Sequence, residues 1–465
     1  MGTRVERDSM GEMRVPEGAY YGAQTQRAVE NFPVSGLTIP TGMIRALGMI
    51  KWAAAQVNQN LGLLDKKRGH AIMQAAQEVI DGKLDDQFPI DVFQTGSGTS
   101  SNMNANEVIG NRASELMGGQ IGSHEPVHPN DHVNKGQSSN DVIPTSIHLA
   151  ASIALAQSLK PQLQALYTAL DTKAKAFDKI IKIGRTHLQD ATPIRLGQEF
   201  SGYAAMVQYG LGRVDQALVA LSQLALGGTA VGTGINTHVE FGGQVAKELS
   251  KMTGLRFHEA RNHFEAQATA DSAVEASGAL KTIAISLSKI ANDIRWLGSG
   301  PRAGLGELQL PAVQPGSSIM PGKVNPVICE SVIQTAAQVI GNDAAITQGG
   351  LGGVFELNLM LPLIAHNLLE SIEILAGAAR IFRTKLIEGL GVDEQKCADN
   401  IEGSLAMSTS LAPVIGYDAA TAIAKEAYAS GRTVREVARE KNILSDEELS
   451  RLLDPLSMTK PDAGP

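Results

Sequence analysis

The segment Gly316–Pro326, with the sequence GSSIMPGKVNP, holds the densest set of side chains that could do chemistry. It brings two hydroxyls, one ammonium and one amide into eleven residues, and its glycines and prolines predict a loop. A hydroxyl beside a fixed cation suits a reaction that removes a weakly acidic C–H proton and must hold the resulting negative charge. This loop therefore predicts acid–base chemistry through an anionic intermediate.

Two further segments are rich in hydroxyls and amides. Gly96–Asn102 could cradle a carboxylate with its hydroxyls and backbone N–H groups, especially if a helix begins near Asn102. Taken alone, it is better explained as a turn followed by a helix N-cap. Gln137–Asp141 lies directly before an apolar helical pattern, and its Asn140 and Asp141 are equally plausible caps.

Histidines mark two other polar segments. His128 and His132 lie four residues apart, a spacing that can chelate zinc on a helix, but Pro129 disfavours a regular helical turn through His128. A metal site is therefore the weaker interpretation. His187, within Gly184–Asp190, is the best acid–base candidate because it lies among polar residues at a predicted turn between two long helices. A single histidine is nevertheless more often structural than catalytic.

Composition narrows the possible classes of function. The formal net charge of −8 argues against a nucleic-acid partner. Two cysteines, Cys329 and Cys397, exclude a disulfide scaffold and an iron–sulfur cluster held by cysteine alone. The glycine-rich stretches 227–234 and 349–353 lack the preceding strand and the Gly-Lys-Ser/Thr of a nucleotide loop, so we expect tight turns there.

The chain also offers no signal for a membrane. We find no run of about 18 apolar residues, so no membrane span is expected. The first residues are mixed in charge and lack the apolar stretch of a signal peptide. A reducing cytoplasm is the simplest compartment for this chain.

Long helices must position these segments. Apolar residues recur at alternating steps of three and four, the a/d pattern of helices packed at shallow angles, and each helix could run about 30 residues, or about 45 Å. The four stripes are Leu280, Ile283, Leu287, Ile290, Ile294 and Leu297; Val207, Leu211, Val214, Leu218 and Leu221; Leu159, Leu163, Leu166 and Leu170; and Leu361, Ile364, Leu368, Ile372 and Leu375.

The pattern of apolar and polar residues divides the chain into three parts. Residues 1–136 are mixed, with helices expected near 44–61 and 70–80; residues 137–394 hold the long stripes of a central five-helix domain; residues 395–465 form short helices. Thr433–Glu436 and Ser445–Glu448 have the pattern of capping boxes. Gly298–Gly322, rich in glycine and proline, predicts a long irregular loop, and such loops are often functional.

Taken together, these motifs resemble the fumarase/aspartase superfamily, and specifically its class II fumarate hydratases, over essentially the whole chain. Gly316–Pro326 is similar to the superfamily signature GSSxMPxKxNP, which is highly specific. Gly184-Arg-Thr-His187 discriminates within the superfamily, because aspartases carry Gln where this chain has His187. Gly322 and the Asn236-Thr-His238 segment also resemble the fumarase form.

The resemblance implies a fold and an activity. It implies an all-α subunit of three domains in a homotetramer, whose central helices form a 20-helix core, with each active site built from three chains. It implies reversible, stereospecific hydration of fumarate to (S)-malate, a reaction of the tricarboxylic acid cycle. The substrate would be a small dicarboxylate, with no cofactor, no metal, no nucleic acid and no membrane partner.

The same resemblance assigns roles to residues. Ser317 would take the C3 proton of malate, and His187, paired with Glu330, would orient or protonate the water that leaves or attacks at C2. Substrate binding and stabilisation of the aci-carboxylate intermediate would fall to Ser97, Gly98, Thr99, Ser138, Ser139, Asn140, Thr186, Ser318, Lys323, Val324 and Asn325. A second dicarboxylate site would comprise His128, Pro129, Asn130 and Asp131.

Two departures and two alternatives accompany this hypothesis. Some family members have a basic residue where this chain has Glu125, which puts the second site in doubt, and Gly136 stands where Ser is usual. An ammonia lyase such as aspartase is the alternative activity, against which His187 argues. A helical scaffold without activity is the alternative of another class, and the intact donor set argues against it.

Overall fold

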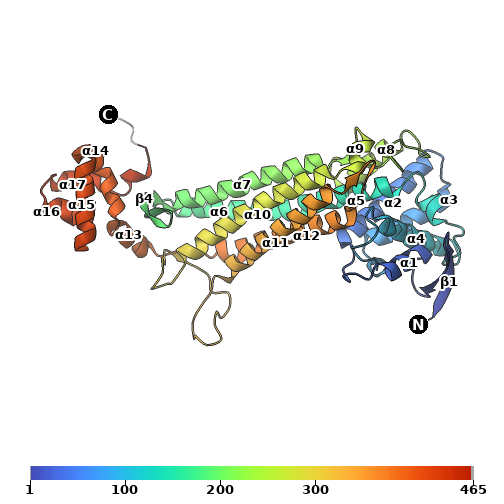
Figure 1. The fold of residues 1–465 in the computed structure, drawn as a ribbon, viewed down its shortest axis with the longest axis horizontal. Coiled ribbons are helices and arrows are strands. Elements are labelled where there is room, and N and C mark those ends of the chain that lie inside the picture. Colours follow the sequence, from blue (N-terminus) through green and yellow to red (C-terminus); the bar gives the residue numbers. More distant parts are fainter. Residues whose placement is uncertain (1, 462–465) are drawn as a thin grey trace. The chain divides into compact units, whose positions relative to one another are not determined.

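The structure, a computed structural model, describes residues 2–461 and is mostly helical (Figure 1). Its helices are α1 (Ala23–Asn31), α2 (Thr41–Asn60), α3 (Lys66–Ile80), α4 (Thr99–Leu116), α5 (Ser139–Ala154), α6 (Lys160–Ala176), α7 (Leu196–Ala220), α8 (Phe241–Thr253), α9 (His263–Ala268), α10 (Asp271–Leu297), α11 (Val327–Gly350), α12 (Leu361–Phe382), α13 (Glu394–Glu402), α14 (Ala412–Ile415), α15 (Tyr417–Ser430), α16 (Val434–Glu440) and α17 (Asp446–Leu452). The prediction of a mainly helical fold is confirmed.

Short two-stranded ribbons interrupt the helices. Four are antiparallel, and the pair β5–β6 is parallel. The pairs are β1 (Thr3–Asp8) with β2 (Gly11–Pro16), β3 (Ile181–Thr186) with β4 (Gln189–Arg195), β5 (Gln223–Leu224) with β6 (His258–Glu259), β7 (Leu308–Gln309) with β10 (Gly391–Val392), and β8 (Gly353–Val354) with β9 (Leu357–Asn358). The sequence predicted only a turn where β3 and β4 lie, so this hairpin corrects that expectation.

The chain divides into two compact units. The first contains the described residues of Met1–Pro161, Leu211–Ala284 and Thr335–Ala376, and the second those of Gln162–Gly210, Ile285–Gln334 and Gly377–Pro465. The division into residues 1–136, 137–394 and 395–465 stays a prediction.

The first unit is built on α2. Leu47, Ile50, Ala54 and Val57 recur at helical spacing along one face of α2 and are fully buried. This face packs against α3, α5 and α8, and Figure 1 shows α1 to α4 gathered in blue and blue-green beside the start of α5. Burial of an apolar face, rather than helix propensity, supplies most of the stability of such a helix.

In the second unit, the C-terminal helices α13 to α17 have a core of their own. Leu411, Ile423, Val437 and Leu449 are all buried within it. Thr433 and Ser445 each cap a helix in a reciprocal capping box, as the sequence predicted.

The stripe Leu280–Leu297 is also confirmed, because each of its six residues is buried along α10.

The continuous helical stretch Ser139–Ala176 is long and apolar enough to pass a test for membrane spans. It is not a run of apolar residues, because it includes Asn140, Asp141 and His148. Its most apolar window has a mean hydropathy of 1.4, and 67% of that window is buried inside the protein. The core helix of a water-soluble protein passes the same test, so this finding is weak support for a span.

Candidate active site

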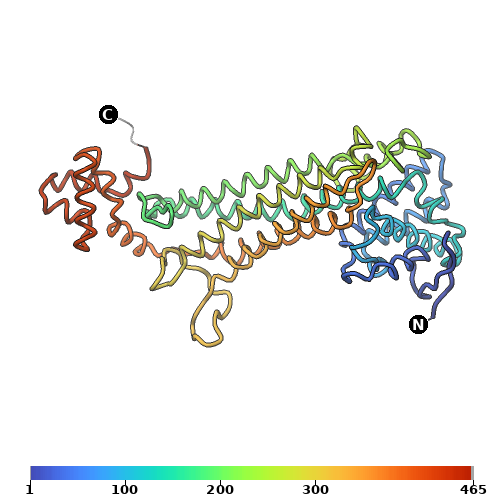
Figure 2. The backbone as a smooth tube through the Cα atoms, in the orientation of Figure 1, coloured from blue at the N-terminus to red at the C-terminus, as the bar shows by residue number. Residues whose placement is uncertain are grey.

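The loop between α10 and α11 carries the residues that the sequence singled out first. Apart from the short strand β7, residues 298–326 are irregular, and the backbone tube extends away from the ends of both helices (Figure 2). The Oγ atom of Ser317, which is half-buried, accepts hydrogen bonds from the backbone N–H of Ile319 at 3.2 Å and of Met320 at 2.9 Å. Two donors aimed at one hydroxyl oxygen stabilise negative charge on that oxygen.

The loop folds back on itself around Gly316. The Gly316 N–H donates to the carbonyl of Lys323 at 2.8 Å, and Nδ2 of Asn325 donates to the carbonyl of Gly316 at 2.6 Å. A Cβ atom on Gly316 would lie 2.6 Å from that Lys323 oxygen, so only glycine permits this approach. A hollow of about 530 Å³ opens here, lined by residues 312–317 and 320–324. Ser317, with its hydroxyl, and Lys323, with its ammonium, are both part of this lining.

His187 lies at the tip of the hairpin β3–β4. Thr186 pairs with Gln189, so His187 and Leu188 form a two-residue turn in which both have positive φ values, +54° and +61°. That combination is typical of a type I′ turn, whose twist matches the flanking strands. The turn presents the imidazole of His187 to solvent.

A buried ionic network holds the base of this hairpin. The carboxylate of Glu307 is fully buried and accepts from Arg185 at 3.0 and 2.5 Å and from Nδ2 of Asn400 at 2.9 Å. The ammonium of Lys182 lies 3.4 Å from the same carboxylate. Burial alone would raise the pKa of Glu307, but the hydrogen bonds and positive charges of its partners outweigh burial and lower it.

Thr99 begins α4 in the first unit. The helix begins three residues before Asn102, after Gly98 in a left-handed conformation with φ of +71°. The hydroxyls of Ser97 and Thr99 lie 2.8 Å apart at this helix N-terminus, where unpaired N–H groups favour an anion. A Cβ atom on Gly96 would lie 1.9 Å from the carbonyl oxygen of Leu359, so this turn is tightly enclosed.

Ser138 caps α5, and neither of the two expected candidates does. Its hydroxyl accepts from the N–H of Asn140 at 3.3 Å, and its own N–H donates to the Asp141 carboxylate at 2.9 Å. Asp141 thus completes a capping box, while Asn140 uses its Nδ2 to donate to the carbonyl of Ala230 at 2.8 Å. The first turn of α5 is therefore fixed by side chains on both sides of it.

The structure joins these two segments directly. Nδ2 of Asn102 donates to Oγ of Ser139 at 3.1 Å. The N-termini of α4 and α5 therefore lie side by side within the first unit, with Thr99 and Ser138 at their starts. Two adjacent helix N-termini make a region that favours carboxylates.

The helical turn Pro129–Val133 follows His128, so His128 remains outside it, as Pro129 predicted. Nδ1 of His128 accepts from the N–H groups of Asn130 and Asp131 at 3.1 and 3.2 Å. A hollow of about 260 Å³ beside this turn is lined also by Arg7 and His124. Among residues 2–461, no group of three or more His, Cys, Asp or Glu side chains is placed to hold a metal ion.

Comparison with known proteins decides which family this set of residues belongs to. A family model described as lyase matches residues 11–341, and one described as fumarase C C-terminus matches residues 407–460. The class II fumarate hydratase of Halobacterium salinarum is 58% identical, over 98% of this chain and 97% of that protein. The human mitochondrial fumarate hydratase is 52% identical, over 98% of this chain and 90% of that protein.

The chain belongs to the class II fumarate hydratase family. The crystal structure of a class II fumarase from Schistosoma mansoni superposes with a TM-score of 0.97, at 41% identity, over 99% of this chain and 100% of that chain. The family resemblance inferred from the motifs is therefore confirmed, as is membership of a family of hydro-lyases.

The residues predicted for the site are distributed over both units. The first unit contains Ser97–Thr99, His128–Asp131 and Ser138–Asn140. The second contains Thr186, His187, Ser317, Ser318, Lys323–Asn325 and Glu330. Glu330 lies in the first turn of α11, and among residues 2–461 no ion pair joins it to His187. Neither unit by itself contains the whole set.

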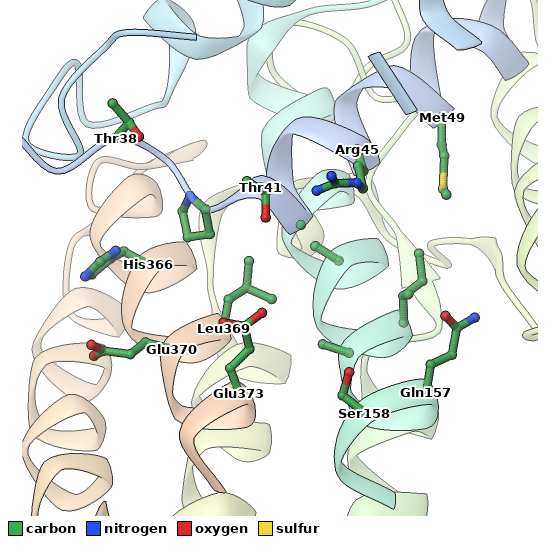
Figure 3. A pocket seen from close by; sticks show the side chains of 15 residues that line it. Thr38, Thr41, Arg45, Met49, Gln157, Ser158, His366, Leu369, Glu370 and Glu373 are labelled. Carbon is green, nitrogen blue, oxygen red and sulfur yellow. The ribbon is translucent and has the colours of Figure 1, made fainter. Parts of the chain in front are cut away.

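Another hollow, shown in Figure 3, contains none of these residues. It measures about 510 Å³ and is lined by α2, α5, α12 and the segment before α2, with Arg45, Leu369 and Glu373 among its side chains. Its lining includes no side chain from the polar segments, so we do not assign it to the hydratase site.

Two buried lysines in contact with the predicted site segments were not predicted from the sequence. Lys182 and Lys51 are both fully buried, and each contacts a segment that carries predicted site residues. The sequence does contain a signal for Lys51. It lies four residues after Leu47 and three before Ala54, and therefore on the apolar face of α2. A lysine on the buried face of a helix is rare unless it is paired.

Proposed function

We propose that this chain catalyses the reversible, stereospecific hydration of fumarate to (S)-malate, a reaction of the tricarboxylic acid cycle. One observation carries the proposal: the Oγ atom of Ser317 accepts two backbone N–H groups in the loop that also carries Lys323. The full-length relatives named fumarate hydratase support the same substrate.

Ser317 would act as the base in the direction of dehydration. A serine hydroxyl is a weak base at neutral pH and serves only if its alkoxide is stabilised. The N–H groups of Ile319 and Met320 lower the energy of that alkoxide, and Lys323 supplies a positive charge in the same loop. The alkoxide would take the C3 proton of (S)-malate, and the electron pair would move into the adjacent carboxylate.

The resulting aci-carboxylate needs donors that are already in place. Ser318, Lys323, Val324 and Asn325 would surround it, and preorganised donors of this kind contribute roughly 3–4 kcal/mol each in oxyanion holes. The hydrogen bond from Asn325 to Gly316 supports this role, because it fixes the orientation of the amide.

The remaining hydroxyls and amides would bind the carboxylates of the substrate. This pocket would comprise Ser97, Gly98, Thr99, Ser138, Ser139, Asn140 and Thr186. The adjacent N-termini of α4 and α5 support it, since both present positive partial charge to an anion.

His187, paired with Glu330, would transfer protons to and from the water that leaves or attacks at C2. In dehydration the pair protonates the leaving hydroxyl, directly or through a water, and in hydration it accepts the proton from the attacking water. Proton transfer and addition of water involve no redox step, so the proposal includes neither a cofactor nor a metal.

Assembly into a homotetramer, with each site built from three chains, is part of the proposal. Large apolar side chains exposed on the long helices support it: Tyr209 and Val219 on α7, Ile285 and Trp296 on α10, and Ile340 on α11. Exposed apolar faces of this kind are expected where other subunits pack. Mixing inactive Ser317→Ala and His187→Asn proteins after dissociation should restore activity in hybrids if the sites are shared.

A second dicarboxylate site at His128–Asp131 also remains a proposal. Glu125 argued against it, but Arg7 from β1, which also pairs with Glu12, lines the neighbouring hollow. Residence in a reducing cytoplasm is likewise proposed, and the two free cysteines, Cys329 and Cys397, support it.

The decisive experiment follows the ultraviolet absorbance of fumarate when purified, chelator-treated protein is mixed with (S)-malate. We expect the absorbance to rise without release of ammonia. A rise with aspartate and none with malate would contradict the proposal and assign an ammonia lyase. Light scattering should give a mass of four 49.1 kDa chains.

A further inference from the structure

Lys51 forms a buried junction beneath the substrate segments of the first unit. It lies on α2 with no part of it exposed, and its ammonium donates to three amide oxygens. The distances are 2.8 Å to Oδ1 of Asn102, 2.9 Å to Oδ1 of Asn134 and 2.9 Å to Oε1 of Gln137. An ammonium has three N–H groups, so each of them has one acceptor.

The three acceptors come from α4 and from the segment between α4 and α5. Asn102 lies in the first turn of α4, three residues after Thr99, and Gln137 directly precedes Ser138. Asn134 ends the helical turn Pro129–Val133 and accepts a further hydrogen bond from Nδ2 of Asn102 at 3.3 Å. One ammonium therefore fixes the relative positions of the N-termini of α4 and α5.

The charged surroundings of Lys51 are few. Asp141 on α5 is the carboxylate that acts on it, and the groups in direct contact, from α4 and from the segment between α4 and α5, are neutral amides. Asp141 is itself fully buried and accepts from the N–H groups of Ser138, Gly227 and Thr229 at 2.9, 3.1 and 2.9 Å. Its oxygens are thus occupied by backbone groups, and no ion pair among residues 2–461 involves Lys51.

A buried ammonium without a paired carboxylate has no advantage in packing, because an apolar side chain of similar length would fill the same space at lower cost in desolvation. Its presence in this chain therefore points to a use of the charge. The adjacent site would hold two carboxylates, and a positive charge in a low-dielectric interior acts on them more strongly than one in water.

We propose that Lys51 is a positioning residue of the hydratase site: its ammonium sets the arrangement of Thr99 and Ser138–Asn140 and adds positive charge behind the pocket that binds the dicarboxylate. This inference rests on the proposed function. It extends that function by naming a residue that does not touch substrate and acts through Asn102, Asn134 and Gln137.

The inference predicts a specific dependence on pH. Burial lowers the pKa of Lys51 to about 7, an effect that the charge of Asp141 partly opposes. As the pH rises above neutral, Lys51 loses its proton, and we expect binding of the dicarboxylate to weaken. Burial raises the pKa of Asp141 to about 6, so its titration affects the acid side of the profile and not the alkaline side.

Lys51→Met tests the inference, since methionine keeps the unbranched shape and removes the charge and the three donors. The readouts are the dissociation constant of succinate, a dicarboxylate that cannot be hydrated, by calorimetry, and KM and kcat for (S)-malate. We expect the dissociation constant and KM to rise about ten- to hundredfold, and kcat to change less. The alkaline weakening of succinate binding should disappear.

Gln137→Glu gives an independent test. A carboxylate in contact with the ammonium favours its charged form and raises the pKa of Lys51. The alkaline limb of succinate binding should therefore move to higher pH, which a purely structural role of Gln137 would not produce. If Lys51→Met does not yield folded protein, this shift decides the question by itself, and an unmoved limb overturns the inference.

Lys173→Met serves as the matched control. Lys173 is partly buried on α6, and its ammonium donates to the carbonyl of Leu390 at 2.8 Å, away from the polar segments. We expect wild-type binding, KM and pH profile in this variant. Folding of all variants is compared by circular dichroism and by their mass in solution.

The outcomes separate the two proposals. Folded Lys51→Met with wild-type succinate binding and KM overturns the role of Lys51 and leaves the hydratase function intact. A wild-type protein that neither converts (S)-malate nor binds succinate overturns the proposed function, and the role of Lys51 with it.

Discussion

Arg185 and Glu307 form a doubly hydrogen-bonded ion pair, with distances of 3.0 Å from Nη1 to Oε2 and 2.5 Å from Nη2 to Oε1. Arg185 directly precedes Thr186 and His187 in the hairpin, and Glu307 lies in the segment that leads into the Ser317 loop. The pair therefore ties the segment carrying the proposed acid–base histidine to the segment that leads to the proposed base.

Removing the charge of Glu307 should destabilise the protein. Glu307→Gln removes the carboxylate from the partly buried Arg185 and from the buried Lys182, which keeps Glu199 at 3.5 Å. Loss of one partner of a buried pair costs about 3–5 kcal/mol. Urea unfolding followed by circular dichroism measures this. Glu12→Gln is the control, because the Arg7–Glu12 pair is exposed and such pairs contribute about 0–1 kcal/mol. Equal unfolding midpoints for the two variants would contradict the prediction.

The same carboxylate predicts how stability depends on pH. Despite burial, its positive partners hold the pKa of Glu307 below the usual value for glutamate, which is about 4.3 in unfolded chains. Its contribution is therefore fully present above about pH 4.3 and is lost as the pH falls through the lower, folded-state pKa. The difference in urea midpoint between wild type and Glu307→Gln should be constant from pH 5 to 7 and shrink below about pH 4. A difference that grew on acidification would show that the sign is wrong.

Ser317→Ala should remove the proposed base. Proton transfer by a positioned group contributes about 10²–10⁴-fold, so kcat for (S)-malate should fall by that order while KM changes little. Ser201→Ala is the matched control, since Ser201 is an exposed residue of α7 whose hydroxyl donates to the carbonyl of Gln198. Retention of more than a tenth of wild-type kcat in Ser317→Ala would exclude Ser317 as the base.

His187→Asn should lower kcat without disturbing the hairpin. His187 has a φ of +54°, and asparagine tolerates this left-handed conformation better than most residues, so the turn survives while the imidazole is lost. We expect a fall of about 10²–10⁴-fold in kcat. Leu188→Gly alters the neighbouring turn position, where φ is +61°, and should keep near-wild-type kcat. Similar losses in both variants would point to the turn, rather than the imidazole, as the cause.

Gly96→Ala should damage the start of α4. The added Cβ would lie 1.9 Å from the carbonyl oxygen of Leu359, so the turn before Thr99 must shift, at a cost of about 1–3 kcal/mol or more. We expect a lower midpoint in urea and a higher KM. Gly18→Ala, at an exposed turn position with nothing within 4 Å of its Cβ, should leave stability unchanged or raise it by up to about 1 kcal/mol.

The sequence predicted the helices because their signals are local. The stripe Leu280–Leu297 and the capping boxes at Thr433 and Ser445 depend on spacings of three and four residues, which the helix itself imposes. The loop Gly316–Pro326 was equally visible, because its glycines, prolines and polar groups lie within one short stretch. These features, with the family they indicate, are what the sequence by itself determined.

Only the tertiary structure decided how the polar segments are held. The burial of Glu307 between Arg185 and Lys182 and the contact of Lys51 with Asn102 join residues from about 50 to more than 100 positions apart. No local pattern encodes such contacts, because a buried charge is stabilised by whichever partners the folded chain brings to it. The chemistry of the site was therefore visible in the sequence, whereas the buried charges that position it became visible only after the chain had folded.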